Sequence, residues 1–234
     1  MEKKELPNKK PLDKKPQDAQ AKPEAKSSGK LKAILNRTAD IIKLIFGICL
    51  LPFVYFLTES FLMQFSGLDS LLQSYFWAGV ATLLLVHLFI WEPAIIYNRG
   101  HRLLEVVFNF FQPLVKFAPY VFPIYTLIVF MVYALLSLFI QDSWFLQYAL
   151  YFLGLTFALH LIFVSRTVRS KKGDILMSNY IFSFSFIYIV DICLFSFLLS
   201  LAVKDYSFAK FVVYGFSAAA EVFKAVFNQL FLFK

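Results

Sequence analysis

Apolar residues occupy long uninterrupted runs of this chain, and charged residues return only at short intervals between them. Three runs, at residues 70–91, 117–141 and 143–165, each extend over more than 20 residues without a charge. At a rise of about 1.5 Å per residue, a helix of this length crosses a hydrocarbon core of about 30 Å. Because a lipid-exposed backbone must satisfy its own hydrogen bonds, the runs predict helices. We therefore expect an all-α, polytopic membrane protein.

Five apolar segments predict transmembrane spans, at about residues 44–65, 71–97, 118–140, 144–165 and 179–203. The first apolar run begins only after Lys43, which is too late for a cleavable signal peptide, so we expect an uncleaved first span. Residues 206–233 are ambiguous, because polar residues recur at spacings of three and four: Lys210, Tyr214, Ser217, Glu221, Lys224 and Asn228. We favour a sixth span with this stripe facing the bundle interior, over a helix lying in the membrane interface.

Residues 1–40 have a different composition, with eleven Lys/Arg, six Asp/Glu and no aromatic residue. The net charge of +8 alone would suggest a nucleic-acid partner, but no ring in this segment could stack on a base. Such a tail is typical of disordered segments that are attracted to anionic lipid headgroups. We predict a disordered basic tail at 1–40 and a helical transmembrane domain at 41–234. The expected partners are the lipid bilayer and another membrane protein, and no nucleic acid.

Basic residues also predict the orientation. They precede the first span and follow the second and fourth spans, whereas the loops at 66–70 and 141–143 contain none. This alternation indicates a cytoplasmic N-terminus in a cell inner (cytoplasmic) membrane, with Lys204 as a mild exception. Cys49 and Cys193 lie within apolar runs, so we expect buried thiols and no disulfide.

The segment after the second span carries the clearest candidate chemistry. Polar residues between 98 and 116 recur on one side of a helix, and the simplest interpretation is an amphipathic helix at the cytoplasmic interface. His101 and Glu105 are four residues apart on this helix, so their side chains project to the same side. Two such groups could share a metal ion, although the spacing alone is a weak signal.

The run Gly100, His101, Arg102 and Glu105 resembles the opening of the metal-binding helix in the site-2-protease class of intramembrane metallopeptidases. The resemblance covers about residues 90–200, and its other parts are apolar stretches of low specificity. They are the segment 117–125 and, in the fourth predicted span, Gly154, Thr156, His160 and Phe163. It implies His101 and Glu105 as metal ligands, with zinc as the possible ion. His160, at a depth near that of His101, is a candidate third ligand, although no motif fixes it.

Three departures from that family imply an inactive relative. Arg102 stands where the resemblance places the general-base glutamate, and a guanidinium cannot accept the proton of water. Glu105 stands where the second histidine ligand would be. Members of that family also carry a strand-like insert after the metal-binding helix, and the corresponding segment of this chain is too short to contain it. Asp191 is not assigned the family's later aspartate role, because Ile192 follows it where a glycine is expected.

Ionisable residues inside the predicted spans are costly in lipid, so they mark cavities or helix-to-helix contacts. From the predicted helix ends, His87 and Asp191 lie at a similar depth, and Glu92 and His160 share a shallower level. For both pairs, a structural hydrogen bond is the simplest interpretation, and a proton path is the alternative.

Three functions follow from these patterns. The first is a membrane protein that binds another membrane protein or lipid. It would have no enzymatic activity and no cofactor. The second is an active metal-dependent peptidase with an unusual ligand set. The third is a small transporter, which would need more paired polar residues than His87 and Asp191 supply.

Overall fold

The computed structural model describes residues 24–89, 121–140, 142–170 and 180–231. The chain divides into two compact units, Met1–Ile41 and Ile42–Lys234, which are described separately. In the first unit the described residues begin the long helix α1 (Glu24–Ser66). Residues 24–40 of the predicted tail are therefore helical, and the rest of that tail lies outside the described residues.

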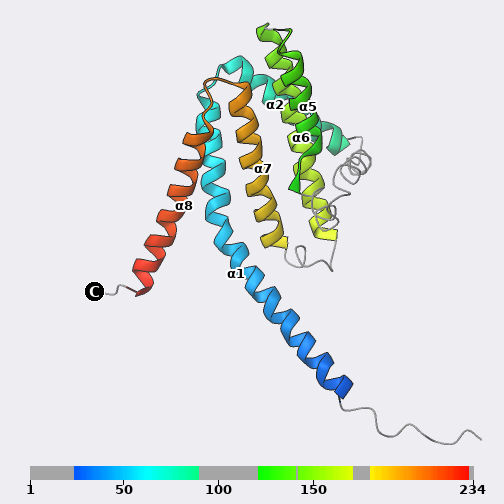
Figure 1. The fold of residues 1–234 in the computed structure, drawn as a ribbon, viewed down its shortest axis with the longest axis vertical. Helices are drawn as coiled ribbons and strands as arrows, with labels where there is room; N and C mark the ends of the chain where they lie inside the picture. Colours follow the sequence, from blue (N-terminus) through cyan, green and yellow to red (C-terminus); the bar gives the residue numbers. More distant parts are fainter. Residues whose placement is uncertain (1–23, 90–120, 141, 171–179, 232–234) are drawn as a thin grey trace, which may run out of the picture. The chain divides into compact units, whose positions relative to one another are not determined.

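The second unit contains the remainder of α1 and five further helices (Figure 1). They are α2 (Ser70–Phe89), α5 (Ile124–Leu136), α6 (Ser143–Ser170), α7 (Tyr180–Ala202) and α8 (Phe208–Phe231). Every regular element in the described part of the chain is helical, which confirms the predicted all-α class.

Five helices are long and apolar enough to cross a membrane, and they give the chain its multi-pass character. They are Thr38–Ser66, Ser70–Phe89, Ser143–Val168, Tyr180–Ala202 and Phe208–Phe231. The set differs from the one predicted, because α5 has only 13 residues and measures about 20 Å. Pro123 stands at its N-cap, where a residue without a backbone N–H is tolerated. The predicted span at 118–140 therefore does not form a helix long enough to cross the membrane. The ambiguous C-terminal segment does, as α8.

Large apolar side chains remain exposed on these helices, as expected where the surrounding medium is hydrocarbon rather than water. Leu88 and Phe89 are 75% and 74% exposed, for example. The expectation that both cysteines are buried was wrong. Cys49 is exposed and Cys193 is half-buried, because an apolar residue of a membrane helix can face lipid as well as protein.

The helix α6 lies among α2, α5 and α7 and packs against all three (Figure 1). Two glycines bring α2 and α6 together at backbone distance. A Cβ on Gly79 would overlap the carbonyl oxygen of Tyr151, and a Cβ on Gly154 would overlap that of Phe76. Small residues of this kind allow membrane helices to approach closely and gain dispersion contacts.

The first and last long helices are also joined directly. The Ser60 hydroxyl donates to the Phe211 carbonyl at 3.0 Å, and the Ser207 backbone N–H donates to Gln64 Oε1 at 3.2 Å. Gly215 of α8 packs against Leu57 of α1. These contacts fix the N-terminal half of α8 against α1.

Candidate functional site

A buried histidine–aspartate pair joins α6 to α7 inside the membrane domain. His160 Nε2 lies 3.0 Å from Asp191 Oδ2, and the two side chains are 1% and 0% exposed. Apolar residues that neighbour the pair along both helices are buried as well, including Leu159, Ile187 and Ile192. In such surroundings an ionisable group is costly unless it is paired, so the contact contributes to holding the two helices together.

One oxygen of the Asp191 carboxylate faces the histidine, and the other does not. The two facing atoms, His160 Nε2 and Asp191 Oδ2, are at ion-pair distance. Asp191 Oδ1 has no hydrogen-bond donor among the described residues. Because neither side chain is exposed, the pair is closed to a substrate in this conformation.

Asp191 is predicted to pair with His87 or with another polar group of the bundle. The structure shows that its partner is not His87, and the helix ends explain why. The helix α6 continues to Ser170 rather than ending at residue 165. His160 therefore lies about 15 Å from that end, and Asp191 lies about 16 Å from the start of α7, so they are at the same level. The expectation that Asp191 has a polar partner inside the bundle is confirmed, but the partner is His160.

His87 lies instead beside a cation of α6. Its Nε2 is 3.1 Å from Arg166 Nη2, and it is two residues from Phe89, the last residue of α2. A guanidinium has only donors, so Nε2 accepts this hydrogen bond, and a neutral imidazole then carries its proton on Nδ1. This contact ties the end of α2 to α6.

Two further polar contacts connect neighbouring elements, and neither was predicted. The hydroxyls of Thr58 and Tyr188 are 2.8 Å apart, between α1 and α7. In the turn before α8, the Tyr206 hydroxyl donates to Ser196 Oγ at 3.0 Å. Burial raises the pKa of Tyr206 to about 12, so this donor keeps its proton at neutral pH. No spacing in the sequence indicates these pairs, because each joins residues of different elements.

The predicted metal set cannot be assembled from the described residues. Two members of the set, His101 and Glu105, lie outside the described residues, and the third, His160, is already paired with Asp191. The intramembrane residue Glu92 also lies outside the described residues. Within the described ranges, no group of three or more His, Cys, Asp or Glu could hold a metal ion. The three-residue zinc set remains a prediction from the sequence.

The polar stripe of α8 is not buried against the other described helices. The buried side of α8 consists of Phe211, Gly215 and Ala219. The stripe lies on a different side and all its members are exposed: Lys210, Tyr214, Ser217, Glu221, Lys224 and Asn228. The prediction that the stripe packs inward was therefore wrong. Spacing establishes that polar residues share a side, but it does not establish which side contacts the bundle.

An ion pair stands near the middle of this stripe. Lys224 Nζ lies 2.7 Å from Glu221 Oε1, and the two side chains are 68% and 69% exposed. Glu221 is about 20 Å from the start of α8 at Phe208, which is near the middle of a helix long enough to cross the membrane. The pair is therefore presented laterally at mid-helix.

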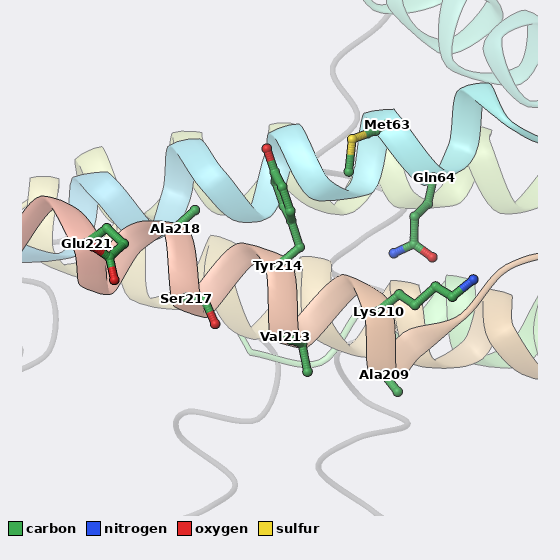
Figure 2. A pocket seen from close by; sticks show the side chains of 9 residues that line it. All are labelled: Met63, Gln64, Ala209, Lys210, Val213, Tyr214, Ser217, Ala218 and Glu221. Carbon is green, nitrogen blue, oxygen red and sulfur yellow. The ribbon is translucent and has the colours of Figure 1, made fainter.

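A groove of about 750 Å³ runs beside the N-terminal half of the stripe, between α1 and α8 (Figure 2). Its lining includes Met63 and Gln64 of α1, with Lys210, Tyr214 and Glu221 among the α8 residues. Gln64 points from α1 toward α8, and its Nε2 has no acceptor among the described residues. The stripe and this groove together form an outward-facing surface, which we call the α8 face.

No protein-family model matches this chain, and neither a curated protein nor a solved structure was found to match it. A function must therefore be inferred from the chain's own residues and geometry.

Proposed function

We propose that this chain is an integral membrane protein without peptidase activity that binds another membrane component along the α8 face. The observation that carries the proposal is the exposed pair of Glu221 and Lys224 at the middle of a membrane-crossing helix. Charged side chains within hydrocarbon are costly, and they usually face a cavity or a partner. In the described chain these two side chains are exposed, so a partner in the plane of the membrane is the environment that fits them.

The buried polar pair has a different role in this proposal. His160 and Asp191 stabilise the contact between α6 and α7, and their burial leaves no access for a substrate. Neither residue is assigned to catalysis. The outward-facing α8 face is the better candidate for binding, because it combines exposure, polarity and a groove.

The absence of peptidase activity rests on the sequence alone. Arg102 and Glu105 replace the base and one histidine ligand of the peptidases that this chain resembles. We propose that these peptidases and this chain are related, and that the site has decayed here. The basic residues around the predicted loops further support a cytoplasmic N-terminus in the inner membrane.

Photo-crosslinking in native membranes tests the binding proposal. A photoreactive amino acid is placed at Ser217 or Asn228, both exposed on the stripe, in the full-length chain. The matched control places it at Phe227, which is 57% exposed on the same helix but is not a member of the stripe. We expect adducts with a protein or lipid from the stripe positions and few from Phe227. Equal yields at all three positions would refute a specific binding surface.

Purified protein tests the proposed loss of catalysis. The wild type, Arg102→Glu, Glu105→His and the double variant are compared for zinc content and for cleavage of membrane-peptide substrates. Gain of zinc in the double variant alone would support a decayed site. Zinc-dependent cleavage by the wild type that disappears in His101→Ala would overturn this part of the proposal.

A further inference from the structure

We propose that the partner on the α8 face is a second copy of this chain, docked about a two-fold axis perpendicular to the membrane. This inference rests on the proposed function and specifies its partner. In the docked pair, Glu221 of each copy contacts Lys224 of the other. The two reciprocal contacts form a ring of four alternating charges.

The symmetry of the membrane sets the geometry. Two copies inserted in the same orientation present α8 in parallel, so each residue lies opposite its own counterpart. Glu221 and Lys224 are three residues apart and already in contact within one copy at 2.7 Å. Their offset along the helix axis is about 4.5 Å, which the long lysine side chain spans. A carboxylate that faces its counterpart therefore also reaches the lysine of the second copy.

The neutral members of the stripe fit the same arrangement. Ser217 and Asn228 each meet the same residue of the second copy, and hydroxyl and amide groups both donate and accept hydrogen bonds. Ser217 and Ala218 are small and lie beside Glu221, which lets two helices approach closely. Lys210 would face its own like charge, but it is three residues from the turn, where a long side chain can reach water.

The position of the charges favours a protein helix over a lipid. Lipid headgroups lie at the two surfaces of the bilayer, whereas Glu221 and Lys224 are near the middle of α8. An acyl chain offers neither a donor nor an acceptor at that level. A second copy supplies both charges at the required height without any further component.

Charge reversal provides a test that a folding defect cannot imitate. In a self-pair of Glu221→Lys the ring contains four lysines, and in a self-pair of Lys224→Glu it contains four glutamates, so each variant repels a copy of itself. Two differently tagged full-length copies are co-expressed and co-purified in mild detergent. We expect wild-type pairs, at least a tenfold loss for each variant with itself, and recovery when the two variants are mixed. The double reversal Glu221→Lys with Lys224→Glu should also recover self-pairing.

The control variant is Lys204→Glu, which reverses an exposed charge in the turn before α8 and should leave pairing unchanged. A second measurement uses the wild-type charges. Asn228→Cys, with Cys49 and Cys193 replaced by serine, should form an intermolecular disulfide, whereas Phe227→Cys should not.

A wild type that neither co-purifies with itself nor crosslinks through position 228 would overturn the inference. Self-pairing that persists in both single variants would overturn it as well. If photo-crosslinks from the stripe then lead to a different protein or to lipid, the proposed function stands and only the identity of the partner is wrong. If the stripe yields no adducts at all, both fail.

Discussion

At the scale of single residues, the sequence identifies the costly groups better than it identifies their partners. His160 and Asp191 are recognisable in the sequence as ionisable residues in apolar runs, and in the structure they pair with each other. Their pairing depends on where the helices end, and an error of five residues at the end of α6 changes the level by about 7 Å. The helix α6 continues beyond its apolar run through Arg166 and Arg169, so the first charge does not mark the helix end, and the pairing itself could not be predicted.

Replacing one member of the pair should cost more than the removed contact alone. Asp191→Leu leaves His160 buried without its carboxylate, and His160→Leu leaves the carboxylate without its partner. We expect each to lower stability by about 1–3 kcal/mol while membrane insertion is retained. The double variant should be less destabilised than the sum of the two, because no polar group is then left unpaired. Thermal unfolding in detergent measures all four proteins, and strict additivity would contradict the pairing.

At the scale of elements, the apolar pattern predicts that helices exist but not how each one faces its surroundings. Six of the expected helical segments are present, including the ambiguous one at 208–231. The pattern failed at α5, where Pro123 delays the start of the helix. It failed again at α8, because lipid and protein interior are both apolar and the same stripe is compatible with either direction.

The contact between α2 and α6 depends on the absence of a side chain at Gly79. In Gly79→Ala the new Cβ meets the Tyr151 carbonyl, so the helices must separate and lose dispersion contacts. We expect a loss of about 1–3 kcal/mol, as for other overpacked sites. Gly67→Ala is the matched control, because the nearest atom to its Cβ would be 3.4 Å away and the turn tolerates it. Equal thermal stability of the two variants would show that this close approach is unimportant.

At the scale of the whole molecule, the predicted orientation gives a simple experimental distinction. Single cysteines replace Asp69 or Asp142 in a background without Cys49 and Cys193. Both positions are exposed and flank helices long enough to span the membrane, and we expect them outside the cytoplasm. They should react with a membrane-impermeant thiol reagent in intact cells, whereas a cysteine at Lys171 should react only after lysis. The opposite labelling pattern would reverse the topology.

The hydrogen bonds between α1 and α8 have a consequence for how the protein is made. Ser60 and Gln64 are synthesised about 150 residues before their partners Phe211 and Ser207, so their bonds form only after every intervening helix has emerged. Until α8 is inserted, Ser60 and Gln64 lack these interhelical partners and Leu57 lacks its contact with Gly215. The packing of α8 against α1 is therefore a late step in assembly, which follows the synthesis of all the intervening helices.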